Sequence, residues 1–169
     1  MIDWKKLKKF WRNEDGIAVT ELAVVTPVFL IMFLSTIELG HMIYYSITVE
    51  KGLRSAVTYA GRVEEHDVTT IQNTKNIAMT GSPSGTDDFL VSGWENAGAS
   101  VTFSEDTYNQ AMNGGVEDIA ETVISVTADV PYVPVVGVLI PALEYLMSSQ
   151  FRDGELYITL THEQAIIGN

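Results

Sequence analysis

The fold is decided by residues 17–45, which read IAVTELAVVTPVFLIMFLSTIELGHMIYY. As one helix this stretch would extend about 43 Å, because an α-helix rises about 1.5 Å per residue. A hydrocarbon core is about 30 Å thick, so the stretch can cross a membrane with some tilt. We therefore predict one transmembrane helix over 17–45. Pro27 has no backbone N–H to donate, and so predicts a kink about a third of the way along this helix.

A cleaved secretory signal peptide is the other interpretation of an apolar run that follows lysines. Such signals have an apolar stretch of only about 7–15 residues, closed by a site of small residues. The run here is longer, and no A-x-A-like site closes it. A membrane anchor is therefore favoured.

The distribution of charge predicts the orientation of the span. Residues 1–16 contain five basic and three acidic residues, a balance of +2. Positive flanks remain in the cytoplasm, so the C-terminal part is expected to lie on the other side. The predicted organisation is a basic cytoplasmic leader at 1–16, the transmembrane helix at 17–45 and an extracytoplasmic domain at 46–169.

Two acids, Glu21 and Glu38, interrupt the apolar run, and an ionised carboxylate within hydrocarbon is costly. Glu38 lies about 30 Å along the helix, where it is expected to reach the outer headgroups. Glu21 lies within about one turn of the start of the run. From its position alone, Glu21 either snorkels to the cytoplasmic interface or pairs with a positive group.

Composition excludes several classes of function. From residue 17 onward the chain carries 5 basic and 19 acidic residues, a balance of −14. Such a surface repels phosphate, so a nucleic-acid partner is not expected. The chain has no cysteine, which excludes disulfides, thiolate catalysis and thiolate metal sites.

The junction between leader and helix resembles a known processing motif. Residues 12–16 (RNEDG) precede 17–21 (IAVTE) and 22–27 (LAVVTP), and the apolar run follows. This order is similar to that of type IV pilin-like proteins, and closest to the TadE-like minor pilins, or pseudopilins, of the Tad (tight adherence) pilus. Residues 49–62 also resemble the helical extension that follows the span in TadE-like proteins.

The resemblance implies that a prepilin peptidase cuts between Gly16 and Ile17, and that Glu21 is the motif glutamate. The cut would create an α-ammonium at Ile17, one helical turn from Glu21 and on the same face. Glu21 could then neutralise its own terminus or that of a neighbouring subunit, which would fix the axial register of a filament. The implied partners are the membrane, other pilin and minor pilin subunits, and the Tad assembly platform. The implied role is pilus assembly or adhesion.

The C-terminal part is predicted to be α+β. Apolar spacing continues the first helix to about Arg62 and places a second helix at 66–80, followed by a loop at 81–88. Three later runs alternate as half-buried strands do. Their inward faces are Ala99, Val101 and Phe103; Ile124, Val126, Ala128 and Val130; and Leu156, Ile158 and Leu160.

These strands are expected to form a small antiparallel sheet on the C-terminal half of the first helix, as in a type IV pilin-like fold. Val136, Leu139, Ile140, Leu143 and Met147 recur at helical spacing and predict a further amphipathic helix. The prolines and Glu144 within 130–147 argue against a second span there.

No catalytic or metal site is evident in the sequence. His41, His66 and His162 are scattered singly, without the spacing of metal ligands. No nucleophile elbow or phosphate-binding loop is present, so we expect neither an enzyme nor a cofactor. Two alternatives to a minor pilin are open: a major pilin of a type IV-like filament, and a single-span membrane protein with an uncleaved leader and a periplasmic partner-binding domain.

Overall fold

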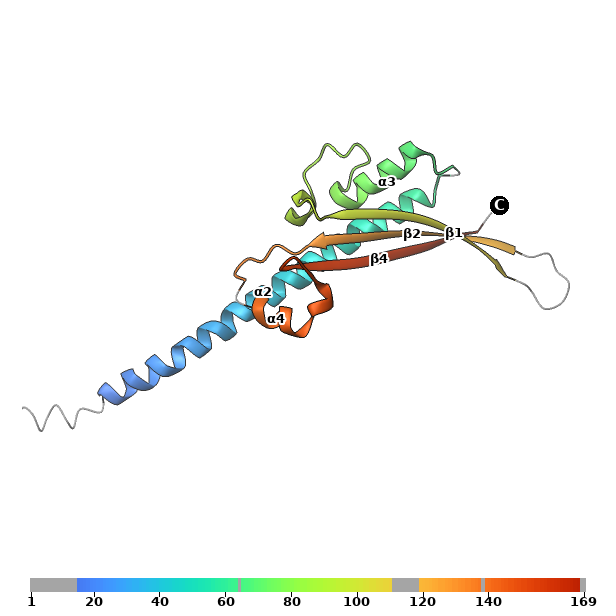
Figure 1. Cartoon of the computed structure of the whole chain (residues 1–169). Coiled ribbons are helices and arrows are strands. Elements are labelled where there is room, and N and C mark those ends of the chain that lie inside the picture. Colours follow the sequence, from blue (N-terminus) through green and yellow to red (C-terminus); the bar gives the residue numbers. More distant parts are fainter. Residues whose placement is uncertain (1–14, 64, 111–118, 138, 168–169) are drawn as a thin grey trace, which may run out of the picture.

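The structure is a computed structural model, and it describes residues 15–63, 65–110, 119–137 and 139–167. All but the last two residues of the predicted leader lie outside these ranges. The described residues form one long helix, two shorter helices and a four-stranded sheet (Figure 1). The predicted α+β fold class is confirmed.

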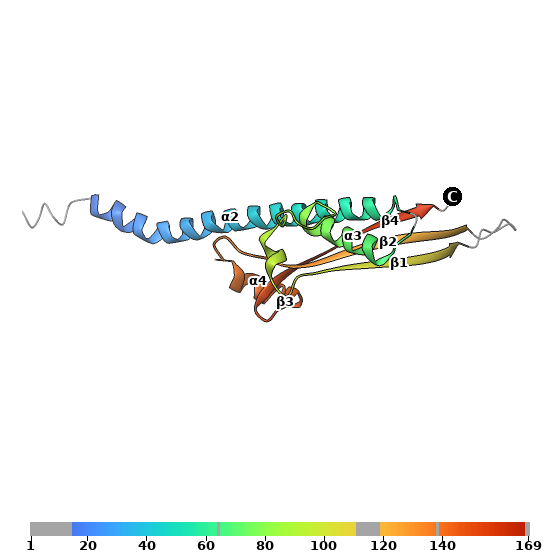
Figure 2. The ribbon, with the colours of Figure 1, turned by 90° about the horizontal axis from the view of Figure 1, so that it is seen from above.

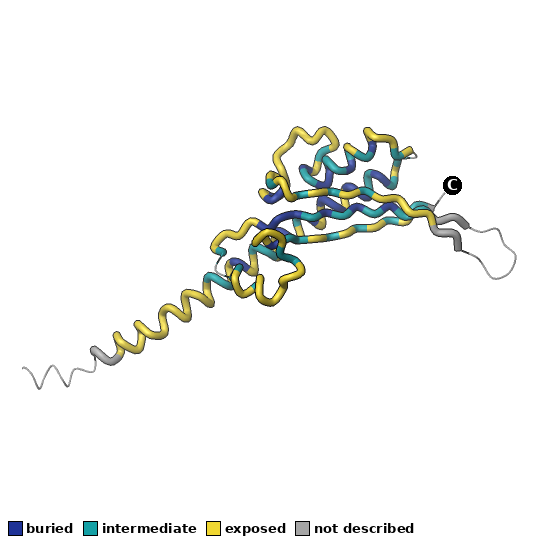
Figure 3. The backbone as a smooth tube through the Cα atoms, in the orientation of Figure 1, coloured by how far each residue is buried: buried dark blue, intermediate teal, exposed yellow. Residues whose placement is uncertain are grey.

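The long helix α2 runs without interruption from Asp15 to Ala60. It therefore includes the whole predicted span and most of the predicted extension toward Arg62. Figure 3 shows that its N-terminal part is exposed while its C-terminal part carries buried residues. Within the described residues, α2 is the one helix that is long and apolar enough to cross a membrane.

The second helix, α3, runs from Val68 to Thr80 and has a defined cap at each end. Asp67 accepts a hydrogen bond from the backbone N–H of Thr70 at 2.7 Å, as an N-cap does. At the other end Gly81 adopts φ +80°, and its N–H donates to the carbonyl of Ile77. A left-handed residue at this position ends a helix, and glycine adopts it without steric cost.

The sheet is antiparallel and has the strand order β1-β2-β4-β3. The strands are β1 (Ser100–Gln110), β2 (Ile119–Pro131), β3 (Phe151–Arg152) and β4 (Glu155–Ile167). A short 3-10 turn, η1 (Ser92–Glu95), precedes β1, and another, η2 (Ser148–Gln150), precedes β3. Figure 2 shows α2 and α3 on the same face of this sheet.

The core lies between that face and the C-terminal half of α2. Val49, Leu53 and Val57 of α2 are completely buried against the sheet. The predicted inward face of β2 is completely buried too, and it consists of Ile124, Val126, Ala128 and Val130. The predicted faces of β1 and β4 are buried or packed against the same core. The predicted packing of the sheet on the first helix is therefore confirmed.

The predicted helix over 136–147 is wrong in extent. The observed helix α4 includes only Ile140–Leu146 and contains no buried residue. Gly137 adopts φ +69°, which an α-helix does not accommodate, and Pro141 lies in the first turn of α4. Val136 therefore belongs to a loop rather than to a helical stripe, although Ile140 and Leu143 do pack on the core.

Candidate functional site along the N-terminal helix

The N-terminal half of α2 projects from the domain as a bare helix. We call residues 18–37 the bare segment: most of its side chains are exposed, including Leu22, Phe29 and Phe33. At about 1.5 Å per residue its 20 residues extend about 30 Å, which matches a hydrocarbon core. The bare segment is thus compatible with a single membrane span.

Three hydroxyl groups in the bare segment donate to carbonyl groups of the helix itself. Thr26 donates to the carbonyl of Leu22 at 2.6 Å, and Ser35 donates to that of Ile31 at 2.7 Å. Thr36 makes the same kind of bond. A polar group already bonded within its own helix is cheap to place in lipid, so these residues do not oppose membrane insertion.

The predicted processing site lies at the start of α2. Gly16 and Ile17 are both in its first turn, and Glu21 follows Ile17 by four residues within the same helix. Glu21 is exposed. This geometry is the one that an amine at Ile17 and the carboxylate of Glu21 would need to meet. The cut, the pairing of Glu21 and the kink at Pro27, which lies inside α2, remain predictions.

Glu38 occupies an unexpected environment, because its side chain is completely buried. One carboxylate oxygen accepts a hydrogen bond from the hydroxyl of Tyr132 at 2.6 Å. The other accepts from the backbone N–H groups of Val136 at 2.8 Å and Gly137 at 3.1 Å. The expectation that Glu38 reaches the outer headgroups is therefore wrong. The loop after β2 crosses α2 at this level and supplies the donors that water or headgroups would otherwise supply.

Tyr132 connects this carboxylate to the rings of two further residues of α2, and we call Glu38, His41, Tyr45 and Tyr132 the Glu38 cluster. The Tyr132 hydroxyl lies 2.9 Å from Nδ1 of His41, and the Tyr45 hydroxyl donates to the carbonyl of Pro131 at 2.8 Å. The rings of Tyr45 and Tyr132 pack edge to face, with their centroids 5.4 Å apart. Three residues of α2 thus hold the end of β2 and the loop that follows it.

The Tyr132 hydroxyl remains a donor in this environment. Burial, and then the hydrogen bond to Glu38 and its negative charge, raise the pKa of Tyr132 far above its ordinary value. The neutral phenol and the carboxylate therefore coexist, and a hydrogen bond to a charged acceptor is stronger than one between neutral groups. Sequence spacing could have grouped Glu38, His41 and Tyr45 on one helix face. It could not have placed Tyr132 beside them, because Tyr132 lies 94 residues after Glu38 in the chain.

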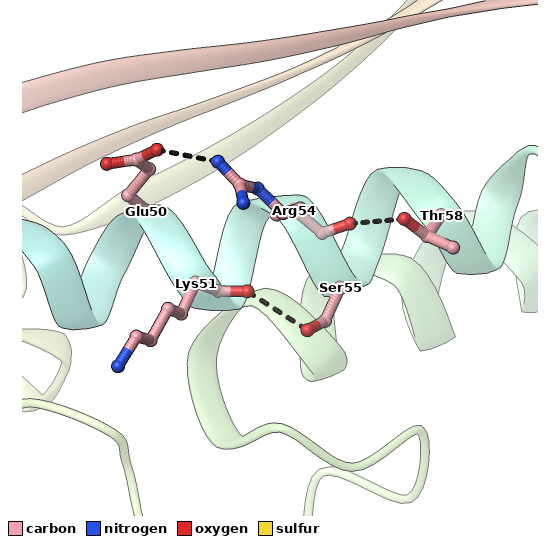
Figure 4. Close-up of polar contacts among 5 residues, drawn as sticks. All are labelled: Glu50, Lys51, Arg54, Ser55 and Thr58. Atoms are coloured by element: carbon pink, nitrogen blue, oxygen red, sulfur yellow. Dashed lines mark hydrogen bonds and ion pairs between the residues drawn. The ribbon is translucent and has the colours of Figure 1, made fainter.

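The exposed face of α2 beyond the Glu38 cluster carries a polar ridge made of Glu50, Lys51, Arg54, Ser55 and Thr58 (Figure 4). A guanidinium nitrogen of Arg54 lies 3.1 Å from a carboxylate oxygen of Glu50, which is one helical turn away. Ser55 donates to the carbonyl of Lys51, and Thr58 to that of Arg54. Arg54, Thr58 and Arg62 also line a shallow open pocket. The ridge is exposed to solvent.

The described residues contain no group of three or more His, Asp or Glu side chains that could hold a metal ion. His41 belongs to the Glu38 cluster, whereas His66 lies beyond the end of α2 and contacts Glu105 of β1 at 3.1 Å. His162 lies on β4 opposite Val126. The structure therefore does not bring the three histidines together.

The family model of TadE-like protein matches residues 16–58. The match begins at Gly16, includes Glu21 and Glu38, and ends on the polar ridge. The resemblance seen in the sequence is thereby confirmed over this part of the long helix, where the chain is similar to TadE-like proteins. No curated protein and no solved structure matches the chain.

Proposed function

We propose that this TadE-like chain is a minor pilin, or pseudopilin, of a Tad-type pilus and has a structural rather than an enzymatic role. A prepilin peptidase removes residues 1–16, and the mature subunit takes part in pilus assembly or adhesion. Its helix spans the bacterial inner membrane, and its domain lies in the periplasm until the subunit is incorporated or acts at the assembly platform.

The observation that carries this proposal is the continuous helix that runs from the predicted processing site to the core of the domain. α2 begins beside Gly16, presents Glu21 one turn after Ile17, remains bare for about 30 Å and then packs on the sheet. In a filament, such bare segments can pack against one another once they leave the lipid. The family match over residues 16–58 supports the same role.

Mass spectrometry of the N-terminus, on protein isolated from its native host, tests the maturation step. A chain that begins at Ile17 is the expected result. A chain that begins at Met1, in cells with an active prepilin peptidase, would favour the permanent membrane anchor instead. Abundance in sheared filaments then distinguishes a major pilin from a minor one, and we expect a low abundance.

Glu21→Val tests the assembly step. We expect normal or improved membrane insertion, because a carboxylate is removed from hydrocarbon, together with a marked loss of filament incorporation. Thr26→Val is the matched control, since it also places valine in the bare segment but leaves the carboxylate intact. Unchanged incorporation of the Glu21→Val chain would rule out a role for this residue in registry.

A further inference from the structure

The domain exposes an unusually apolar rim beside the bare segment. The rim consists of Val133, Val135 and Val136 in the loop after β2, and of Tyr145, Leu146 and Met147 in and just after α4. All six side chains are exposed, with Tyr145 at 87% and Leu146 at 75%. Exposed apolar patches of this kind mark surfaces that bind a protein or a membrane.

The position of the rim is fixed relative to the helix. Val136 and Gly137 donate their backbone N–H groups to the buried carboxylate of Glu38, which ties the loop to α2. Figures 1 and 2 both place α4 at the end of the domain from which the bare segment projects. Because the bare segment extends about 30 Å, the rim lies at the level where the helix leaves the hydrocarbon core.

The charge of the rim differs from that of the rest of the domain. Residues 131–150 contain a single charged residue, Glu144, whereas the chain from residue 17 onward has a balance of −14. An acidic surface is repelled by anionic lipids, so this segment, which has a single carboxylate, can approach them more closely than the strongly acidic remainder of the domain. Tyr145 has the aromatic ring with a polar tip that favours the boundary between lipid and water.

We propose that this apolar rim inserts into the outer leaflet of the membrane that α2 spans, and so gives the domain a second, interfacial membrane contact. The occupant is lipid rather than another protein, because the rim lies at the end of the domain from which the apolar bare segment projects and carries little charge. The Glu38 cluster positions the rim by holding its loop against the helix. This inference rests on the proposed membrane placement of α2.

Single-cysteine variants of the full-length chain test the proposal, since the chain has no cysteine of its own. Val135→Cys and Leu146→Cys place an environment-sensitive fluorophore on the two parts of the rim. Ile31→Cys reports on the bare segment. Glu65→Cys lies on an exposed residue beyond the far end of α2 and serves as the aqueous reference. Each labelled protein is reconstituted into vesicles of phosphatidylethanolamine and phosphatidylglycerol that contain lipids with a quencher near the headgroup or deep in the acyl chain.

The expected result is a blue-shifted emission for both rim probes and a loss of most of their fluorescence with the shallow quencher. Ile31→Cys should respond to the deep quencher, and Glu65→Cys to neither. If the rim probes are not quenched while Ile31→Cys is, the proposed lipid contact is overturned and the membrane placement stands. A blue shift without quenching also overturns the lipid contact, because protein then covers the rim. If Ile31→Cys is not quenched either, the membrane placement fails and the lipid contact fails with it.

Discussion

At the scale of single residues, Glu38 is a buried carboxylate held by donors rather than by a cation. Within the described residues it forms no salt bridge, and its hydrogen bonds come from Tyr132, Val136 and Gly137. Removing the carboxylate takes the acceptor from the backbone N–H groups of Val136 and Gly137, and leaves the Tyr132 hydroxyl only its contact with His41. A buried polar group that loses its partner is expensive. The stability of the domain should therefore depend strongly on this one side chain.

We expect Glu38→Ala to reduce the free energy of unfolding by about 2–3 kcal/mol, because a buried donor that loses its acceptor retains its desolvation cost. Glu38→Gln should lose less, since an amide oxygen can still accept from Val136 and Gly137. Chemical unfolding in detergent micelles, followed by circular dichroism, measures both. Glu50→Ala is the control in the same helix: its exposed pair with Arg54 should contribute less than about 1 kcal/mol. Equal effects of Glu38→Ala and Glu50→Ala would contradict the role of the cluster.

Asp67 gives a pH dependence with a defined sign. The backbone N–H of Thr70, and then its hydroxyl, lower the pKa of Asp67 below its ordinary value. Because the pKa of Asp67 is lower in the folded state than in the unfolded state, its carboxylate stabilises the fold at pH values above the unfolded-state pKa. This stabilisation is lost as the pH falls through the folded-state pKa. The N-cap of α3 should thus be intact at neutral pH and weaken below about pH 4.

Asp67→Asn keeps a capping oxygen that does not titrate, so it should reduce the loss of thermal stability between neutral pH and about pH 3. Asp67→Ala should lower the melting temperature at neutral pH because the cap is absent. Thermal unfolding of the three proteins at both pH values checks this, and identical pH profiles for Asp67→Asn and the parent chain would refute it.

At the scale of elements, the contact between α2 and α3 depends on a glycine. A Cβ built on Gly52 would lie 2.4 Å from the carbonyl oxygen of Ala78 and 3.0 Å from a Leu90 methyl group. Gly40, in the same helix, would have nothing within 4 Å. The same substitution should therefore have opposite effects at the two positions.

We expect Gly52→Ala to cost about 1–3 kcal/mol, because the backbone of α3 must move away from α2. Gly40→Ala should stabilise the chain by about 0.5–1 kcal/mol, because alanine loses less backbone entropy in a helix. Thermal unfolding of the two variants in micelles gives the comparison. A loss at Gly40 as large as that at Gly52 would mean that the close contact of Gly52 with α3 does not decide the result.

The sequence predicted the elements whose patterns are long and local. The helix over residues 17–45 follows from hydropathy, and the inward face of β2 follows from its alternation. The two-residue strand β3 was not predicted because it is too short to have a pattern. Its hairpin had a usable signal in Asp153-Gly154, whose φ values of +51° and +82° suit a tight turn. The Glu38 cluster could not be predicted, since its donors come from a loop about a hundred residues away.

At the scale of the whole molecule, the structure divides the chain differently from the hydropathy pattern. The domain begins to cover α2 at Glu38, although the apolar run continues to Tyr45. Tyr45 is only 2% exposed and belongs to the core. The boundary predicted between residues 45 and 46 would therefore separate Glu38, His41 and Tyr45 from Tyr132. It would also separate Tyr45 from the rest of the hydrophobic core.

Two fragments test this boundary. A fragment that begins at residue 36 keeps the Glu38 cluster and should unfold cooperatively as a soluble domain. A fragment that begins at residue 46 loses Glu38, His41 and Tyr45, and should be less stable by about 3–5 kcal/mol, the range found when a large core side chain is removed. Denaturant unfolding measures the difference. Equal stability would place the boundary after Tyr45, as hydropathy alone does.

The unbroken course of α2 also has a mechanical meaning. From Asp15 to Ala60 the helix spans about 69 Å, and no turn or linker separates the membrane-facing part from the part inside the domain. A pull on the outer end is therefore carried along one helix, and no loop lies between its two parts to absorb it. Pro27, which has no backbone N–H to donate, is the position at which this helix bends most easily. A force on the domain would be transmitted through α2 to the N-terminal end of the subunit with little loss. The domain would keep its orientation relative to the helix.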